Sequence, residues 1–438
     1  MTQLYYPLRS LREGHWFKLI CGASFQHLPA VRTLTLAYTL AGADCIDVAA
    51  DPAVIGAAQE GLKVAADLEG AARSRGFSSS RRPWLMVSLN DAEDPHFRKA
   101  EFDPDLCPAD CPRPCEKICP AQAIEFHKTS EKQQGQPWKQ EGQGKNLSIP
   151  YSPSTDAFSG VIDQRCYGCG RCLPVCPSQL IYTRSYVSAP TAVAELVMSA
   201  GVDALEIHTR VGHWTDFQRL WQAIAPWADQ LKLLAISCPD GEGLLEYLWA
   251  IYNLIAPLPC TLIWQTDGRP MSGDIGIGAT RAAVKLAQKV LAEELPGYVQ
   301  LAGGTNQYTV SKLRTIGLLK NQIENRAWRV GTSANSEMLD QKGTAKIPAS
   351  SIPSSLPYVS GIAYGSYART LLSPILDQLE KLNEENIHAN LASTSSSSLG
   401  HLEEFPDLLW QAVASAHSLV SQLKSAPVNP KFPQPLFN

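Results

Sequence analysis

Short apolar segments alternate with longer segments of helical periodicity along most of the chain. The pattern predicts strands at 17–21, 45–49, 85–89, 204–208, 232–237, 261–266, 298–301 and 361–364. It predicts helices after them at 28–41, 52–75, 190–200, 215–230, 244–255, 280–294, 308–316 and 369–384. Eight strand–helix pairs in a row are typical of a closed (β/α)8 barrel, an α/β fold of the TIM type. A doubly wound sheet is the alternative.

The alternation stops after the third predicted strand, where a cysteine-rich segment at 102–184 is inserted. We therefore expect the two parts of the barrel at 1–101 and 185–388, with a terminal region at 389–438. Loops that follow barrel strands lie at the carboxyl face, where active sites are built. The insert is thus expected over the mouth of the barrel.

The second of two cysteine runs in the insert is CYGCGRCLPVCP, with thiols at Cys166, Cys169, Cys172 and Cys176. Its spacing, C-x2-C-x2-C-x3-C-P, is that of the bacterial ferredoxin run. The alternative is a zinc site with four cysteines, but such sites usually have two separated C-x2-C pairs. The spacing therefore favours an iron–sulfur cluster.

The first run, CPADCPRPCEKICP, has the spacing C-x3-C-x3-C-x3-C-P, from Cys107 to Cys119. Its end resembles the second run, since CEKICPAQAI parallels CLPVCPSQLI. The internal repeat indicates two related halves. The unusual x3 steps leave open whether this half holds a [4Fe–4S] or a [3Fe–4S] cluster.

Two-cluster ferredoxins take the fourth cysteine of each run as a ligand of the other cluster. By this rule the sequence predicts two clusters, bound by Cys107, Cys111, Cys115 and Cys176, and by Cys166, Cys169, Cys172 and Cys119.

Glycines follow the last two predicted strands, in LAGGTN and in YGSYAR. In barrels this is a common phosphate site, because glycine lets backbone N–H groups approach an anion at a helix N-terminus. The sequence predicts a phosphate-bearing ligand or a flavin here, bound by Gly303, Gly304, Gly365, Ser366 and Arg369. The alternative is that these are ordinary turn glycines.

Other polar residues follow predicted strands and are candidates for the same mouth: Asn90, Asp91, His208, Arg210, Asp267, Arg269 and Asp274. Each alone also fits a helix cap or a loop ion pair. The sequence contains no Ser-His-Asp order, HExxH or Walker A motif, so the catalytic residues of any enzyme are not identified. Four further cysteines lie in or beside strands and are predicted to be small buried apolar residues: Cys21, Cys45, Cys238 and Cys260.

The composition limits the classes of protein to which the chain can belong. The net charge is −4 and 45% of residues are hydrophobic, which excludes global disorder and gives no case for nucleic acid as a partner. The N-terminal residues contain no apolar run long enough for a signal peptide or a membrane span, so we expect a cytoplasmic protein. Clustered cysteines in a reducing compartment favour metal over disulfides.

Two segments outside the barrel pattern are candidates for contact with a partner. The polar segment 127–160 is expected to be a solvated loop, with a docking hairpin as the alternative. A serine-rich linker precedes an amphipathic helix at 403–423, which packs on the barrel or binds a partner, and a proline-rich tail.

Several phrases together carry a family resemblance: LREGHWFKLICGASFQHLP, AGADCIDVAADPAVI, both cysteine runs and LAGGTN. They resemble the cyanobacterial light-dependent period family, LdpA, from the N-terminus through GIAYGSYART. The resemblance implies an iron–sulfur protein that feeds light or redox state into the circadian clock, near the clock's histidine kinases, without an assigned reaction. The alternative is an oxidoreductase in which the clusters pass electrons to a barrel-bound flavin or phosphate ligand.

Overall fold

The computed structural model describes residues 6–22, 27–77, 82–91, 98–119, 122–126, 160–162, 165–166, 172–185, 195, 197–268, 276, 278–320, 357–390 and 400–424. The described chain divides into two compact units, residues 1–94 with 187–438, and residues 95–186. Several predicted segments and residues lie wholly or largely outside the described part: the helix at 190–200, the polar segment 127–160, the serine-rich linker, the proline-rich tail, and the candidates Cys169, Arg269 and Asp274.

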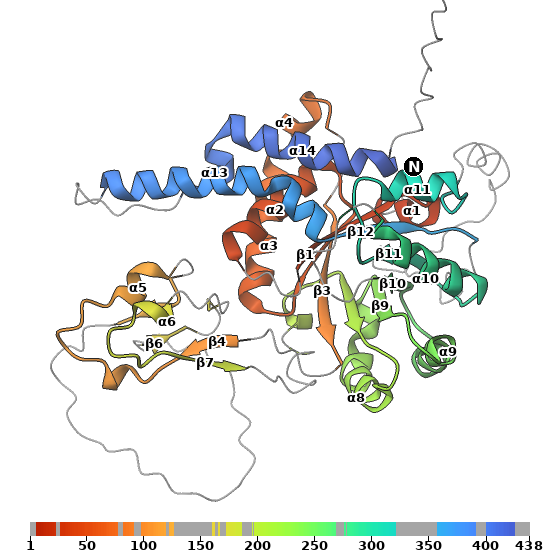
Figure 1. Cartoon of the computed structure of the whole chain (residues 1–438), viewed down its shortest axis with the longest axis horizontal. Coiled ribbons are helices and arrows are strands. Elements are labelled where there is room, and N and C mark those ends of the chain that lie inside the picture. The colour runs from red at the N-terminus through yellow and green to blue at the C-terminus, as the bar shows by residue number, and fades with distance from the viewer. Residues whose placement is uncertain are drawn as a thin grey trace, which may run out of the picture. The chain divides into compact units, whose positions relative to one another are not determined.

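The first unit is a closed barrel of eight parallel strands (Figure 1). Around the barrel the order is β1, β12, β11, β10, β9, β8, β3, β2. The strands are β1 (Trp16–Gly22), β2 (Cys45–Ala49), β3 (Trp84–Asn90), β8 (Ala204–His208), β9 (Leu233–Pro239), β10 (Thr261–Asp267), β11 (Tyr298–Ala302) and β12 (Gly361–Tyr364). The predicted barrel is confirmed, and the alternative of an open doubly wound sheet is wrong.

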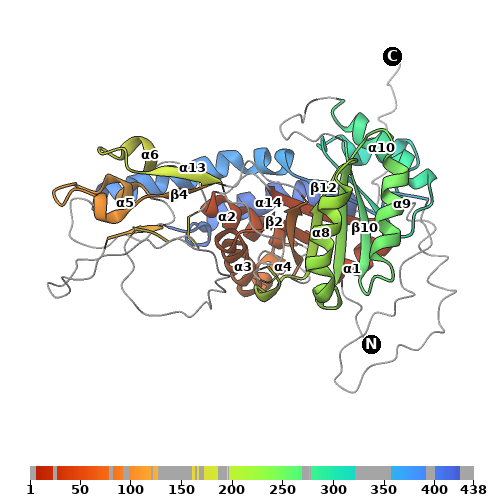
Figure 2. The same ribbon diagram turned by 90° about the horizontal axis from the view of Figure 1, so that it is seen from below.

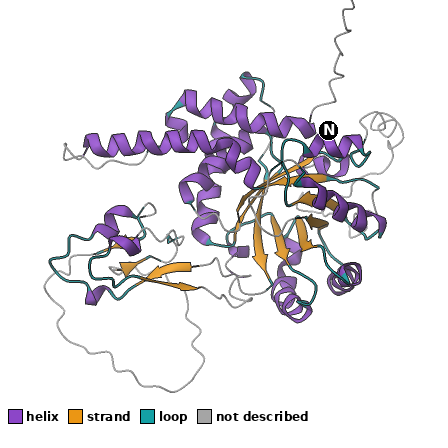
Figure 3. Ribbon diagram, in the orientation of Figure 1, coloured by secondary structure: helices purple, strands orange, loops and turns teal. Residues whose placement is uncertain are grey.

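Helices surround these strands, as Figures 2 and 3 show. They are α2 (Leu28–Ala41), α3 (Pro52–Asp67), α4 (Glu69–Ser74), α8 (Trp214–Ile224), η2 (Ala225–Gln230), α9 (Leu244–Ile255), α10 (Thr280–Ala292), α11 (Thr309–Thr315) and α13 (Ser366–Asn390). Two predicted helices are each divided, since 52–75 forms α3 and α4, and 215–230 forms α8 and η2. Within the described residues, no helix is long and apolar enough to cross a membrane.

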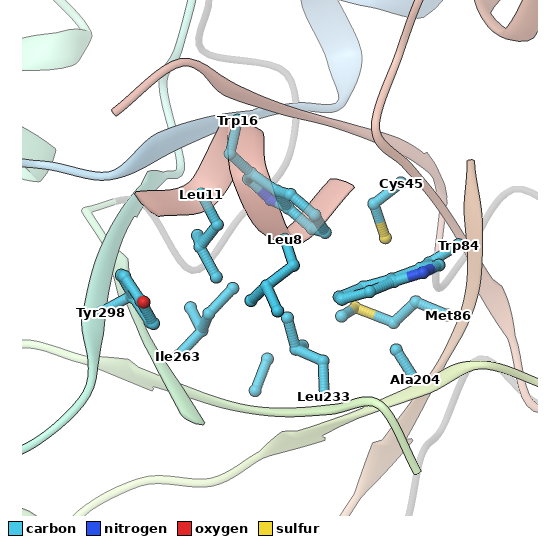
Figure 4. Close-up of a cluster of buried hydrophobic side chains, with 11 residues drawn as sticks. Leu8, Leu11, Trp16, Cys45, Trp84, Met86, Ala204, Leu233, Ile263 and Tyr298 are labelled. Carbon is cyan, nitrogen blue, oxygen red and sulfur yellow. The ribbon is translucent and has the colours of Figure 1, made fainter. Parts of the chain in front are cut away.

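The floor of the barrel is closed by a helix that the apolar pattern did not predict, α1 (Tyr6–Glu13). Leu8 and Leu11 of α1 are buried among inward-facing strand residues, including Trp16, Trp84 and Met86 (Figure 4). The rings of Trp16 and Trp84 pack edge to face, with their centroids 5.7 Å apart. Aromatic side chains of this size fill the lower half of the barrel, so the interior is a packed core there.

The C-terminal region ends in η4 (Leu402–Glu404) and α14 (Pro406–Lys424), which pack against the first unit. Arg32 of α2 donates to both carboxylate oxygens of Glu403, and Lys424 donates to Asp44 at 2.5 Å. Trp410 stacks on Phe77. Of the two alternatives for this helix, packing on the barrel is confirmed. A helix held by this many contacts is a poor candidate for a surface that moves freely to reach a partner.

The second unit is built from short elements around a small apolar core. They are β4 (Arg98–Glu101), η1 (Pro104–Leu106), α5 (Pro114–Ile118), β5 (Ile124–Glu125), β6 (Gly160–Val161), α6 (Cys172–Val175) and β7 (Tyr182–Ser185). Strand β4 pairs antiparallel with β7, and β5 pairs antiparallel with β6. The insertion after β3 is therefore observed, whereas the ferredoxin-like character of its fold stays a prediction.

A single side chain caps the N-terminus of α3. Asp51 accepts a hydrogen bond from the backbone N–H of Ala53 at 2.8 Å, and Pro52 occupies the first helical position. We expect Asp51→Ala to lower the free energy of unfolding by about 1 kcal/mol, because the N–H then loses its acceptor. Asp51→Asn keeps the acceptor, so it should lower the free energy of unfolding by less than half as much. Thermal unfolding followed by circular dichroism measures both variants; equal losses would contradict the capping role.

Candidate functional site

The first cysteine run surrounds the short helix α5. Cys115 lies in the first turn of α5 and is buried, whereas Cys107 and Cys111 are partly exposed. Burial raises the pKa of the Cys115 thiol, while backbone N–H groups of Glu116 and Cys115 itself oppose that shift. N–H groups directed at a sulfur stabilise a thiolate, which is the form that binds metal.

Cys176 from the second run lies near the thiols of the first run. Burial is the largest cause of the raised pKa of Cys107, and the neighbouring thiols of Cys111 and Cys176 add to it. The pKa of Cys115 is likewise raised by burial and then by Cys176 and Cys107. The structure thus brings together the four cysteines assigned to the first cluster, although their role as ligands stays a prediction.

The other three described cysteines of the runs share the apolar core of the second unit. Cys166 and Cys172 are buried, and Cys119 is partly buried against the same core. The backbone N–H of Ala100 donates to the sulfur of Cys166 at 3.4 Å, and that of Ala123 donates to the sulfur of Cys119 at 3.2 Å. Hydrogen bonds to ligating sulfurs are one of the means by which proteins set cluster potentials.

These surroundings fit an iron–sulfur cluster: soft thiol donors, an apolar shell and backbone N–H groups aimed at sulfur. Among the described residues, no three His, Cys, Asp or Glu side chains form a group that could hold a single metal ion. A cubane differs from such a site because each thiolate binds a different iron, which spreads the thiols apart.

The glycine pair after β11 and the start of α13 form the predicted anion site. Gly303 and Gly304 have positive φ angles of 70° and 77°, a conformation that other residues rarely adopt. Arg369 donates to the carbonyl of Ile20 and to the hydroxyl of Ser366, both at 3.2 Å. Burial lowers the pKa of Arg369, so its positive charge is disfavoured where it stands and an anion nearby would stabilise it. The anion site stays a prediction.

Asp91, predicted as a mouth residue, is the centre of a hydrogen-bonded group. Thr209 donates to Asp91 at 2.5 Å, and His213 Nδ1 donates to Asp91 at 3.1 Å. Arg210 Nε donates to His213 Nε2 at 2.6 Å. Burial raises the pKa of Asp91, and the bonds from Thr209 and His213 oppose that rise. The contact of Asp91 with His213 fits a polar loop contact, here a hydrogen bond and not an ion pair, since Nε2 of the same ring accepts from Arg210.

The remaining mouth candidates are placed differently. Asn90 is exposed at the end of β3, and Asp267 is partly exposed at the end of β10. His208 ends β8, with Nε2 at 3.1 Å from Glu206 Oε1. Arg269 and Asp274 lie outside the described residues. The four cysteines predicted to be apolar core residues are confirmed as buried: Cys21, Cys45, Cys238 and Cys260.

A polar layer inside the barrel was not identified from the sequence. Lys18 of β1 contacts Asp47 of β2 at 3.1 Å and also donates to Glu206 of β8. Gln265 donates to Glu206 at 2.6 Å, Gln300 donates to Gln265, and Trp16 donates to Gln300. Three strands of this layer carry a charged residue within an apolar segment: Lys18 in FKLIC, Asp47 in CIDVA and Glu206 in ALEIH. That isolated polar residue was the signal available in the sequence.

Electrostatics couples the three charged members of this layer. Burial opposes the charge of Lys18, but Asp47 and Glu206 raise its pKa well above the ordinary value. Burial raises the pKa of Asp47, Lys18 lowers it, and Glu206 raises it again. One cation thus faces two carboxylates in the interior.

Comparison with known proteins identifies the family. A model described as the LdpA Fe-S cluster-binding domain matches residues 107–137 and 147–187, which include both cysteine runs. A second, the Light dependent period A C-terminal domain, matches residues 196–422. The chain is 44% identical over 421 residues to "Light dependent period A" of Synechococcus elongatus, covering 96% of this chain and 94% of that protein.

The chain belongs to the Light dependent period A family.

Membership confirms the resemblance found in the sequence and shows that the inserted unit is an iron–sulfur cluster-binding domain. The C-terminal family domain spans β8 to α14, so it includes five of the eight barrel strands.

Proposed function

We propose that this chain is an iron–sulfur redox sensor in which two clusters report the redox state of the cell to a protein partner. The observation that supports it best is the arrangement of cysteines from both runs around one small apolar core, in a chain whose relative is named for a light-dependent period. Two [4Fe–4S] clusters account for all eight thiols, whereas a [3Fe–4S] cluster on the first group would use seven and leave one cysteine of that group without iron.

A change in cluster charge is large enough to be read at the protein surface. One electron added to a cluster places one negative charge near the surrounding loops. At ~10 Å and an effective dielectric near 20, a unit charge contributes roughly 1–2 kcal/mol. That energy shifts an equilibrium between two surface conformations about tenfold.

The surface for this readout is proposed on the second unit itself. Leu106, Ile118 and Tyr182 are exposed apolar side chains, at 64%, 39% and 54% of their full areas. Leu106 and Ile118 directly precede Cys107 and Cys119, so a change at either thiol is transmitted to them through one peptide bond. The polar segment 127–160, within the same unit, is the second candidate surface.

The partners proposed are proteins of the circadian clock, including its histidine kinases, with a redox carrier as the source or acceptor of electrons. This proposal rests on the family resemblance. The alternative is an oxidoreductase in which the clusters supply electrons to a ligand of the barrel, and the test below separates the two.

We expect capture from lysate by the oxidised and the dithionite-reduced protein to give different sets of partners. Cys169→Ala, which removes a predicted ligand of the second cluster, should no longer give that difference. Cys238→Ala is the matched control, because Cys238 is a buried thiol outside both runs. Quantitative mass spectrometry of the captured proteins makes the comparison.

Two outcomes decide this test. Leu106→Ser together with Tyr182→Ser should keep the iron content and lose the redox-dependent partners, if these exposed side chains belong to the readout surface. Identical partner sets for all states, together with steady electron transfer to a small acceptor, would contradict the sensor and support the oxidoreductase.

A second candidate function is ligand binding at the mouth of the barrel, supported by Arg369 beside the N-terminus of α13. We expect inorganic phosphate or flavin mononucleotide to raise the melting temperature, since a ligand that binds only the native state stabilises it. Arg369→Gln removes a charged hydrogen-bond donor and should weaken binding about tenfold or more. Arg281→Gln is the control, because Arg281 is an exposed arginine of α10. No shift with any of these ligands would contradict the site.

A further inference from the structure

The middle of the barrel carries charge where barrels usually carry branched apolar residues. Lys18, Asp47 and Glu206 are at most 2% exposed, and they come from three different strands. In most TIM barrels the inward positions are dominated by Val, Ile and Leu. The lower layer of this barrel follows that rule in being mostly apolar, so the charges are confined to the level above it.

Stability does not account for this layer. Replacing a buried ion pair or triad by apolar residues of similar volume is often neutral or stabilising, because burial removes the charges from water. Charged groups retained inside a fold at such a cost are concentrated at functional sites.

His208 connects the buried layer to the mouth of the barrel. Its Nε2 lies 3.1 Å from Glu206 Oε1, and its side chain is 29% exposed. A carboxylate oxygen only accepts, so Nε2 carries a hydrogen and donates it to Glu206. In the neutral ring Nδ1 is then a hydrogen-bond acceptor. Within the described part of the chain, no hydrogen bond is made to this atom.

Charged groups lie on the elements around His208, and Glu206, which accepts from Nε2, holds this tautomer. Glu206 accepts from it, and Asp47 interacts with it electrostatically. Lys18 lies behind both carboxylates. Asp91 from β3 is already bonded to Thr209 and His213, and Asp267 ends β10.

The predicted anion site stands on the opposite side of the barrel. In the closed order of eight strands, β8 and β12 are four positions apart, which places them across the barrel from each other. His208 ends β8, whereas Gly365 and Arg369 follow β12. Both ends of parallel strands open to the same carboxyl face. A ligand anchored by an anion at Arg369 therefore has His208 on the far wall.

We propose that the barrel mouth binds a small phosphorylated sugar, with the phosphate at Arg369, Gly303 and Gly304 and a ligand hydroxyl donating to His208 Nδ1. Glu206 is a positioning residue that fixes the tautomer of His208, and the Lys18–Asp47 pair holds Glu206. An acceptor nitrogen across the barrel from an anion site is complementary to a ligand with a phosphate at one end and an O–H donor at the other. The assignment of the sugar end rests on the anion site proposed above.

The test compares three probes by isothermal calorimetry on the full-length protein with its clusters: inorganic phosphate, ribose and ribose 5-phosphate. We expect ribose 5-phosphate to bind about tenfold more tightly than inorganic phosphate, because it adds a hydrogen bond and further contacts. Ribose, which lacks the anion, should bind least. Arg369→Gln should weaken the binding of both inorganic phosphate and ribose 5-phosphate.

His208→Leu removes the acceptor. It should weaken the binding of ribose 5-phosphate about three- to tenfold and leave the binding of inorganic phosphate unchanged. Glu206→Gln keeps the shape of the side chain and leaves Lys18 paired with Asp47, so the fold is expected to survive. It should reduce the preference for ribose 5-phosphate severalfold. If the role of Glu206 were purely structural, the variant would weaken the binding of inorganic phosphate and of ribose 5-phosphate equally.

A spectroscopic measurement tests the contact without relying on variants that fail to fold. In protein labelled with 15N-histidine, the Nδ1 signal of His208 should move when ribose 5-phosphate binds and stay in place when inorganic phosphate binds. The signal is assigned by its loss in His208→Leu, or in His208→Gln if the leucine variant does not fold.

Each outcome decides a different part of the proposal. Binding of inorganic phosphate with no preference for ribose 5-phosphate, or a His208 signal unmoved by the sugar phosphate, overturns the inference and leaves the anion site standing. Absence of binding by either phosphorylated probe overturns the anion site and the inference together.

Discussion

In protein loaded with iron and sulfide without oxygen, Cys166→Ser should lose one of two clusters and keep the other. Two cubanes contain about eight irons per chain, so this variant should retain about four. Cys176→Ser should also retain about four, because it removes a ligand of the other cluster. Iron and acid-labile sulfide analysis, with electron paramagnetic resonance of the reduced protein, measures the loss.

Double variants test which thiols share a cluster. If Cys119 binds the cluster of the second run, Cys166→Ser with Cys119→Ser removes two ligands of one cluster and should still retain about four irons. Cys166→Ser with Cys176→Ser should then lose nearly all iron. The opposite result would show that each run binds its own cluster. Cys260→Ala, at a buried thiol of the barrel, is the control and should keep about eight irons.

Lys18→Met should destabilise the barrel by about 3–5 kcal/mol, since it leaves Asp47 and Glu206 buried without their cation. A triple variant, Lys18→Met with Asp47→Asn and Glu206→Gln, removes all three charges and should recover most of the loss. Lys289→Met is the control, because Lys289 pairs with Asp240 at the surface and such pairs contribute at most about 1 kcal/mol. Chemical unfolding followed by tryptophan fluorescence compares the four proteins.

The loss in Lys18→Met should also depend on pH. The ammonium of Lys18 lowers the pKa of Asp47, so its removal raises that pKa beyond the increase already caused by burial. An acid whose pKa is higher in the folded state binds more protons when folded, and its contribution to stability is lost as pH rises through the folded pKa. The variant should therefore be least unstable in mild acid. A deficit that is constant from pH 5 to pH 8 would contradict a buried unpaired carboxylate.

Periodicity predicted the barrel because each strand of a parallel sheet is buried on both faces and appears as a continuous apolar run. Strands β2, β8 and β12 begin and end at the predicted residues, and the other five differ by one or two positions. Helix α1 was not predicted, since its eight residues are shorter than the window of about 11–18 residues over which helical periodicity is recognised. Its role is tertiary: Leu8 and Leu11 are buried only because the barrel floor is open to them.

The candidate sites were predictable to different degrees. Cysteine spacing predicts the residues of the metal centre, because cluster geometry dictates which positions carry thiols, and their role as ligands stays a prediction. Arg369 and the glycine pair were predicted as an anion site because loops after strands seven and eight commonly bind phosphate in barrels, and that site stays a prediction. The Lys18, Asp47 and Glu206 group was missed, since its members lie in three apolar strands up to 188 positions apart. They meet only when the barrel closes.

The central claim is that the redox state of the clusters changes the surface of the second unit, and amide hydrogen exchange tests it most directly. Exchange is compared in the oxidised and the dithionite-reduced protein, with Cys166→Ser as the variant that lacks one cluster. The account predicts altered exchange in 104–119 and 172–182, which carry the cysteines and the exposed Leu106, Ile118 and Tyr182, and unchanged exchange in β9 and β10. Identical exchange throughout the second unit in both redox states would contradict it.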